Sequence, residues 1–172
     1  MKISILLPYK ENFSPEYPGA VSLFVYETSK ASKYKKQITV FGNTNFKKKF
    51  PLKYTNIDLK KSFIGSQTKD YVKKFINLEK KDNSSIIEIH NRPIYINYLV
   101  NRLNNRIYTL FFHNDPLSMN GSKSINERLK LLDELDKIIF VSKWVQNRFF
   151  EKLDDKLINK TEVVYPSIHK EK

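Results

Sequence analysis

The sequence predicts one α/β domain, a doubly wound and mostly parallel Rossmann-like sheet with helices on both faces in three layers (αβα). β-prone and helix-like segments alternate along nearly the whole chain, which indicates βαβ units. Right-handed crossovers between such strands produce a doubly wound sheet. The length of 172 residues suits a single domain with a sizeable core. In these sheets ligands bind beyond the carboxyl ends of the strands, so polar residues there are the candidates for function.

Seven short β-prone segments are expected to be the strands. They are residues 3–7, 37–41, 54–59, 85–89, 107–112, 137–141 and 162–165. Between them apolar residues recur at helical spacing, which predicts helices over residues 21–31, 71–76, 96–103, 129–135 and 145–149. Ser124 and Glu127 form a capping-box pattern, and Ser142 can cap the last helix, with Trp144 packed beside its inner face.

The composition limits the classes of protein that the chain can belong to. It contains no cysteine, which excludes disulfides, thiolate zinc sites and a cysteine nucleophile. No apolar run approaches the ~20 residues of a membrane-spanning helix, and the first one is too short for a signal peptide. The net charge of +13 reflects either compositional drift in an AT-rich genome or an anionic partner, such as a phosphorylated ligand, acidic lipid or nucleic acid. The lysine runs 47–49 and 60–61 are expected on the surface, where they could contact lipid head groups.

Two polar clusters directly follow neighbouring predicted strands. The first is His90, Asn91 and Arg92, and the second is His113, Asn114 and Asp115. Imidazole and amide groups bind hydroxyls and phosphates, and a guanidinium binds them in a fork. Each cluster alone could merely shape its turn, but both fall on the same rim of the sheet, so we expect them to form one ligand site. A metal held by His90, His113 and Asp115 is an alternative, since all three are permitted ligands.

Three further places on this rim are weaker candidates. Backbone amides at Gly19 and Ala20, where the first helix starts, can hold a phosphate or sugar oxygen, although a simple turn is the other interpretation. Lys10 and Glu11 lie in the same loop and could either point into the cleft or be solvated. The third place is Ser142 and Lys143 after the sixth strand, where capping of the helix is the simpler explanation.

Several familiar patterns are missing from the sequence. It has no G-x-G-x-x-G fingerprint and no P-loop, which disfavours NAD binding and P-loop nucleotide chemistry. No G-x-S-x-G elbow surrounds Ser142, which disfavours a serine hydrolase. No recognition helix or RNP-type aromatic pattern supports nucleic-acid binding, so we expect no nucleic-acid partner.

Five segments together resemble the amino-terminal domain of family 4 glycosyltransferases, and most of all the spore-coat-protein-like or lipopolysaccharide-type group. They are PGAVSLFVYE (18–27), IIEIHNRP (86–93), FFHNDPLSMNG (111–121), DKIIFVSKWVQNRFF (136–150) and VVYPSI (163–168). The similarity runs from Met1 to about Ile168. The order and spacing of the segments carry it more than any single motif does.

The resemblance implies the GT-B architecture, in which two Rossmann-like domains face each other across a cleft. The amino-terminal domain chiefly binds the acceptor, and the carboxy-terminal domain binds the nucleotide-sugar donor. Transfer in this family retains the anomeric configuration and usually needs neither metal nor cofactor. By position, His113 would be the catalytic residue, facing the reacting sugar or the acceptor, and Gly19 would lie near the donor diphosphate and the acceptor. Residues 90–92 would line the acceptor side.

On this interpretation residues 1–168 are the acceptor-binding domain, residues 169–172 are a hinge or tail, and the nucleotide-sugar domain is absent. We expect such a chain to be inactive alone, as a shortened form of a longer protein or the product of a split or degraded gene. The whole enzyme would be a hexosyltransferase that acts on a glycan or lipid-linked acceptor in cell-envelope polysaccharide synthesis. It would be cytoplasmic or peripheral on the inner face of the cytoplasmic membrane. The alternative is a stand-alone, non-catalytic module that binds sugars or lipid head groups.

Overall fold

The computed structural model of the chain describes residues 1–59 and 66–166, and its centre is a parallel β-sheet. Seven strands pair in the order β3-β2-β1-β4-β5-β6-β7, each parallel to its neighbours. They are β1 (Ile3–Leu6), β2 (Ile38–Gly42), β3 (Tyr54–Asn56), β4 (Ile86–His90), β5 (Ile107–Phe112), β6 (Lys137–Phe140) and β7 (Thr161–Val163). The predicted doubly wound, Rossmann-like α/β fold is confirmed.

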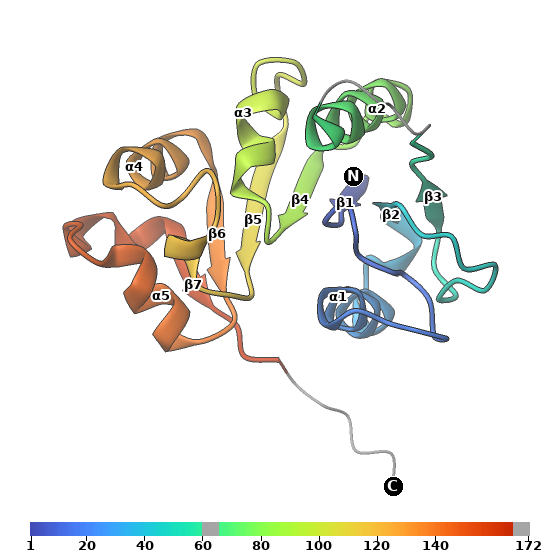
Figure 1. Cartoon of the computed structure of the whole chain (residues 1–172), viewed down its shortest axis with the longest axis horizontal. Coiled ribbons are helices and arrows are strands. Elements are labelled where there is room, and N and C mark those ends of the chain that lie inside the picture. Colours follow the sequence, from blue (N-terminus) through green and yellow to red (C-terminus); the bar gives the residue numbers. More distant parts are fainter. Residues whose placement is uncertain (60–65, 167–172) are drawn as a thin grey trace, which may run out of the picture.

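Helices cover both faces of the sheet. The α-helices are α1 (Ala20–Ala31), α2 (Gln67–Asp82), α3 (Ile96–Leu99), α4 (Ile125–Glu134) and α5 (Lys143–Phe150). Short 3-10 helices are η1 (Lys35–Gln37), η2 (Pro93–Tyr95), η3 (Pro116–Ser118) and η4 (Asp155–Lys160). Figure 1 shows α1 on one side of the sheet and α2, α3 and α4 on the other, so the helices and the sheet form three layers.

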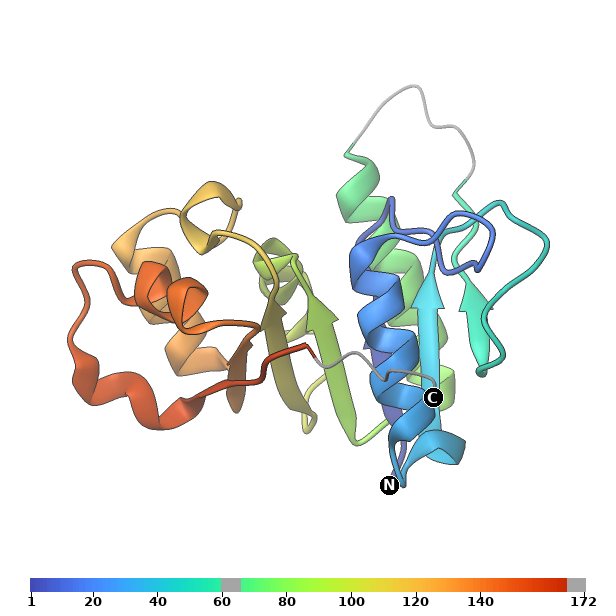
Figure 2. The same cartoon turned by 90° about the horizontal axis from the view of Figure 1, so that it is seen from below.

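The strand order reverses next to β1. The chain runs outward from β1 to β2 and β3, and α2 then carries it back across the sheet to β4, on the other side of β1. The carboxyl ends of β1 and β4 therefore form the switch point where open α/β sheets bind ligands. Figure 2 shows the arrowheads of β2 and β4 pointing to the same edge, where the loop after β1 and the start of α1 also lie.

The two faces of the sheet have separate apolar cores because successive side chains of a strand alternate between faces. Val21 and Val25 of α1 pack with Ile5 and Val40 on one face. The larger core on the opposite face joins α2 to α5. Its members of lowest exposure include Tyr71, Phe75, Ile87, Leu99, Phe112, Phe140 and Phe149.

The local capping signals are confirmed. The Ser124 hydroxyl accepts from the Glu127 amide at 3.2 Å, and the Glu127 carboxylate accepts from the Ser124 amide at 2.8 Å. The Ser142 hydroxyl accepts from the Val145 amide at 3.2 Å and caps α5. The prediction for Trp144 is wrong, because α5 turns Val145 and Phe149 inward and leaves Trp144 58% exposed.

Five predicted elements are shorter in the structure, and two of them, the first and sixth strands, lose only their last residue. The helix expected over 96–103 ends at Leu99, whose carbonyl accepts from the amides of both Arg102 and Leu103 in a tightening turn. The expected 54–59 strand ends at Asn56. The expected 162–165 strand is Thr161–Val163, which pairs with β6 at the edge of the described sheet. Edge strands of a sheet are commonly short.

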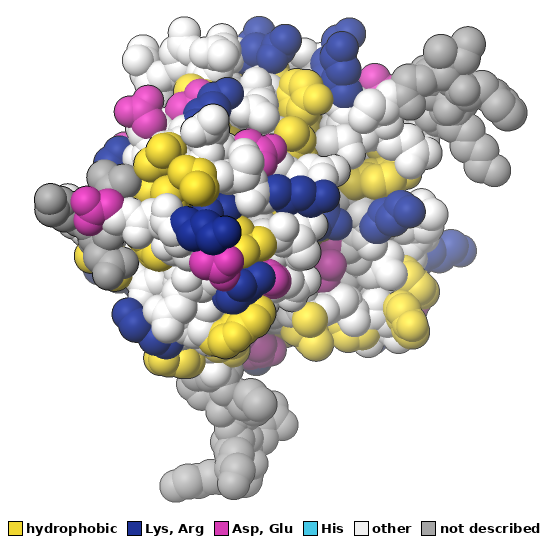
Figure 3. Space-filling view, turned by 60° about the vertical axis from the view of Figure 1, so that its left-hand side comes forward, with side chains coloured by type: hydrophobic (Ala, Val, Ile, Leu, Met, Phe, Trp, Pro, Cys, Tyr) yellow, Lys and Arg dark blue, Asp and Glu magenta, His cyan; other side chains and the backbone are white. Residues whose placement is uncertain are grey.

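Charge is spread over the surface seen in Figure 3, where lysine and arginine side chains alternate with acidic and apolar ones rather than forming one patch. Lys47 and Lys48 are exposed as expected, whereas Lys49 is half-buried and its ammonium group donates to the Phe46 carbonyl. Lys60, Lys61 and residues 169–172 lie outside the described residues. Among the helices of the described part, none has the length and apolar character required to cross a membrane.

Candidate functional site

The two predicted polar clusters meet at the rim of the sheet. β4 and β5 are neighbours, and the Nδ1 atom of His90 lies 2.9 Å from the Nε2 atom of His113. The Asn91 side-chain oxygen accepts from the His113 amide at 2.8 Å, and the Asn91 amide donates to the carbonyl of Phe111 at 2.9 Å. Asn91 has a left-handed backbone (φ 51°), a conformation that asparagine tolerates better than most residues. Asn91 thus ties the end of β4 to the loop that carries His113.

Aromatic rings enclose the two histidines on the α1 side of the sheet. The ring of His90 is fully buried and stacks on Phe111 at 4.7 Å and 16°. Phe24 of α1 meets the His113 ring edge-on at 4.9 Å and 82°. Burial and the neighbouring His90 lower the pKa of His113 from 6.5 to about 3. His113 is therefore a neutral imidazole at physiological pH, able to donate at one nitrogen and accept at the other.

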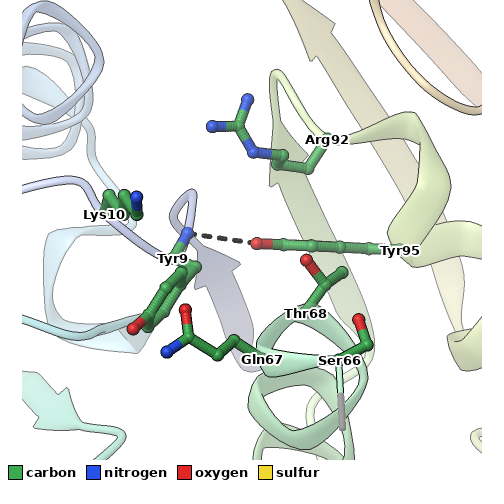
Figure 4. Close-up of a pocket in the computed structure, with 7 residues that line it drawn as sticks. All are labelled: Tyr9, Lys10, Ser66, Gln67, Thr68, Arg92 and Tyr95. Carbon is green, nitrogen blue, oxygen red and sulfur yellow. Dashed lines mark hydrogen bonds between the residues drawn. The ribbon is translucent and has the colours of Figure 1, made fainter.

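A pocket of about 570 Å³ opens at the switch point. It is lined by Tyr9, Lys10, Ser66, Gln67, Thr68, Arg92 and Tyr95. Figure 4 shows Lys10 and Arg92 reaching it from the loops after β1 and β4, with the start of α2 as another wall. Its volume is in the range of small-molecule sites. Two of its described lining residues are cationic and none is acidic, so the pocket favours an anionic group.

Tyr95 fixes one side of this pocket. Its hydroxyl accepts from the Tyr9 amide at 3.0 Å, the contact drawn as a dashed line in Figure 4. Burial raises the pKa of Tyr95 to about 12, although the hydrogen bond from Tyr9 and the nearby Arg92 act in the opposite direction. The phenol consequently stays neutral. The Tyr71 ring packs on both tyrosines, at 5.6 Å from Tyr9 and 5.9 Å from Tyr95.

A carboxylate of the chain itself, that of Glu11, lies at the start of α1. The Glu11 carboxylate accepts from the Ser22 amide at 2.8 Å, in the first turn of the helix that begins at Ala20. Gly19 permits this approach, because a Cβ at that position would collide with the Glu11 carboxylate. A phosphate at this helix start would meet the like charge of Glu11, so the arrangement favours a neutral hydroxyl there.

Of the other predicted residues, Asp115, Ser142 and Lys143 have protein partners. Asp115 accepts from the Leu117 amide at 3.0 Å and pairs with Arg148 at 3.1 Å. Burial raises the pKa of Asp115, but these hydrogen bonds outweigh it and the pKa lies below its ordinary value. Lys143 donates to Gln146 at 2.7 Å, Ser142 caps α5, and Asn114 is exposed. The structure therefore brings His90, Asn91 and His113 into one contact network, whereas Asp115 pairs with Arg148 of α5 and Ser142 caps the same helix.

Sequence reasoning missed Glu88, Phe24, Tyr9 and Tyr95. The Glu88 carboxylate lies 2.7 Å from the Nε2 atom of His90. The sequence could have predicted this contact, because Glu88 stands two residues before His90 in a strand and so lies on the same face of the sheet. Phe24 and the tyrosines carry no comparable local signal, since apolar and aromatic residues are common throughout the chain.

The metal alternative lacks its third ligand. The facing nitrogens of His90 and His113 are hydrogen-bonded to each other, and Asp115 pairs with Arg148. Within residues 1–59 and 66–166 no three histidine, aspartate or glutamate side chains converge closely enough to hold an ion.

The parallel strand order defines a Rossmann-like domain, and its polar rim lies at the switch point where such sheets bind ligands. Solved structures narrow the fold to that of one part of a glycosyltransferase. The Anabaena protein Alr3699/HepE, solved with UDP, superposes with a TM-score of 0.65 at 15% identity, covering 98% of this chain and 44% of that one. Its complex with UDP-glucose gives 0.64 at 12% identity over the same shares. A glycosyltransferase from Rickettsia africae ESF-5 gives 0.61 at 13% identity, covering 95% and 42%.

The chain spans less than half the length of these similar proteins. No known protein-family model matches its sequence, and no curated protein matches it. At these identities the likeness establishes a glycosyltransferase-like fold.

Proposed function

We propose that this chain is the acceptor-binding domain of a retaining glycosyltransferase, which transfers a sugar from a nucleotide-sugar to a glycan or lipid-linked acceptor in cell-envelope polysaccharide synthesis. One observation carries the proposal. The cationic pocket of Lys10 and Arg92 and the His90–His113 pair both lie on the carboxyl-end rim of the sheet, where His90 ends β4 and the other three residues follow β1, β4 and β5. A glycosyl acceptor with a phosphate-bearing anchor needs both an anion site and neutral groups that orient a hydroxyl.

Each part of the rim has a proposed role. Lys10 and Arg92 hold the anionic group of the acceptor, since a charge-assisted hydrogen bond is about twice as strong as a neutral one. His113 contacts the reacting sugar or the acceptor hydroxyl as a neutral imidazole. The Gly19 turn, where Glu11 already accepts from Ser22, contacts a sugar hydroxyl. Asn114, which is exposed beside His113, completes this side of the site.

The donor is proposed to bind mostly to a second domain, as in the two-domain architecture that the sequence resembles. Two of the similar structures hold UDP or UDP-glucose, which makes UDP-sugars the first donors to test. Transfer is proposed to occur on the cytoplasmic side of the membrane, where the exposed lysines can contact anionic lipids. This domain alone is then expected to bind acceptor without catalysing transfer.

Binding of paired acceptor probes tests the anion site. The chain is titrated with a lipid-diphosphate-linked monosaccharide and with the same sugar as a glycoside that lacks diphosphate. We expect the diphosphate form to bind more tightly and to perturb amide signals around Lys10 and Arg92. Lys10→Gln and Arg92→Gln should each weaken it roughly tenfold, which corresponds to about 1.4 kcal/mol. Lys36→Gln is the matched control, because it removes the same charge from η1 at the amino-terminal edge of the sheet.

Turnover tests the catalytic assignment. In the full natural protein that carries this chain, supplied with UDP-sugars and glycan acceptors, His113→Ala and Asn114→Ala should each lose most of the activity. Wild-type rates in both variants would refute the site. An equal loss of affinity in Lys36→Gln and Arg92→Gln would refute the anion pocket, because nonspecific attraction by the positive charge of the protein would then explain the binding. Acceptor binding without turnover in the full protein would instead support the non-catalytic binding module.

A further inference from the structure

Glu88, His90 and His113 form a continuous row on one face of the sheet. Glu88 and His90 are two residues apart in β4, so their side chains point to the same side. His90 is opposite Phe111 in the β4–β5 register, and His113 follows two residues later. The same face carries α1, whose Phe24 contacts both imidazole rings, at 6.1 Å from His90 and 4.9 Å from His113.

Two short contacts join the three groups. The Glu88 Oε1 atom lies 2.7 Å from His90 Nε2, and His90 Nδ1 lies 2.9 Å from His113 Nε2. Both distances are those of good hydrogen bonds. The His90 ring is held by stacking on Phe111 and is fully buried, so no solvent molecule substitutes for these partners.

The protons in this row have a single arrangement when both imidazoles are neutral and the Glu88 carboxyl group is ionised. An ionised carboxylate only accepts hydrogen bonds, so the proton of His90 must be on Nε2, facing Glu88. His90 Nδ1 then has a lone pair and can only accept. The proton of His113 must therefore be on Nε2, facing His90, which leaves the lone pair of His113 on Nδ1.

We infer that Glu88 and His90 are positioning residues that hold His113 as its Nε2–H tautomer and present its Nδ1 lone pair to a substrate hydroxyl. The substrate part of this inference rests on the proposed function, whereas the tautomer part stands on the geometry of the row. No described residue hydrogen-bonds to Nδ1 of His113, so this atom is available. The negative charge of Glu88, relayed through His90, makes Nδ1 a better acceptor, as a carboxylate does for the imidazole that it orients in other sites.

The nitrogen resonances of the imidazoles test the tautomer without any assay of activity. In the folded, ¹⁵N-labelled chain at about pH 8, we expect a protonated Nε2 and an unprotonated Nδ1 in both His90 and His113. We also expect a scalar coupling across the hydrogen bond between His113 Nε2 and His90 Nδ1. A protonated Nδ1 in His113, as a doubly protonated His90 would produce, overturns the inference.

Glu88→Gln tests the role of the carboxylate, because it keeps the shape of the side chain and removes its charge. We expect loss of the coupling across the hydrogen bond, or exchange of the His113 Nε2 proton with water at least roughly tenfold faster. Glu162→Gln is the matched control, since Glu162 is exposed on β7 and pairs with Lys137 at 2.6 Å. Identical spectra in wild type and Glu88→Gln refute the positioning role. The wild-type spectrum decides the tautomer even if the variant does not fold.

Kinetic measurements distinguish the positioning role of Glu88 from the proposed function. In the full natural protein, Glu88→Gln should lower kcat roughly tenfold with little change in the acceptor KM, because orientation of an acid–base group affects the chemical step. A transferase with the expected tautomer but an unchanged kcat in Glu88→Gln would refute the positioning role and leave the function in place. A protein with the expected tautomer and no transfer activity would refute the proposed function and leave the tautomer in place.

Discussion

Acid should destabilise this protein partly through His113. Burial and His90 lower the pKa of this imidazole from 6.5 to about 3 in the folded chain, and unfolding removes both effects. Between these two values the unfolded chain binds a proton that the folded chain does not. Stability is therefore fully present above the unfolded pKa, begins to fall as the pH drops through about 6.5, and is lost progressively down to about 3.

The size of the effect follows from the two pKa values. A fully shifted histidine lowers the free energy of unfolding by about 1.4 kcal/mol at one pH unit below its unfolded pKa, and by about 2.7 kcal/mol at two units below. Between pH 7.5 and pH 5.5 the term for His113 is thus about 1.4 kcal/mol. Other groups titrate in the same interval, so the informative quantity is the difference between wild type and a variant that lacks the imidazole.

Urea denaturation at both pH values measures this difference. His113→Gln removes the titrating group, and its side-chain amide can still donate to His90 Nδ1. We expect wild type to lose about 1.4 kcal/mol more than His113→Gln as the pH falls from 7.5 to 5.5. Asn114→Gln is the control, because it changes an exposed neighbour without a titrating group and should follow wild type. An equal loss in wild type and His113→Gln would refute the reasoning.

Three further substitutions test single contacts by urea denaturation. Gly19→Ala should lower the free energy of unfolding by about 1–2 kcal/mol, because its Cβ displaces the Glu11 carboxylate from the first turn of α1. In a Glu11→Ala background the same substitution should have a clearly smaller effect, and an equal effect would contradict the contact. Gly121→Ala should lower the free energy of unfolding by about 1–3 kcal/mol, because Gly121 has φ 94° and a Cβ there would press on the Ile94 backbone. An unchanged free energy of unfolding would contradict this strain. Trp144→Ser should change stability by less than about 0.5 kcal/mol, and a larger loss would show that the ring is packed after all.

The parts of the fold that were predictable are those with local causes. Apolar spacing and turn residues locate the strands and helices, and the Ser124–Glu127 box and the Ser142 cap are contacts within four residues of sequence. The placement of both His-Asn clusters on one rim was also predictable, because carboxyl ends of neighbouring parallel strands share an edge. Trp144 could not be assigned by the same means. It stands one residue before Val145, and which face of α5 is inner depends on how the helix lies on the sheet.

The sequence by itself determined the alternation of elements, the doubly wound parallel class and the residues at the strand ends, because short-range periodicity and capping are encoded within a few residues. Only the tertiary structure decided which side chains contact one another at the rim of the sheet. It joined Glu88, His90 and His113 into one row through the β4–β5 register, and it brought the Glu11 carboxylate to the start of α1. It also placed Lys10 and Arg92 around one pocket. These contacts join residues on separate segments, so they exist only when the whole sheet is assembled.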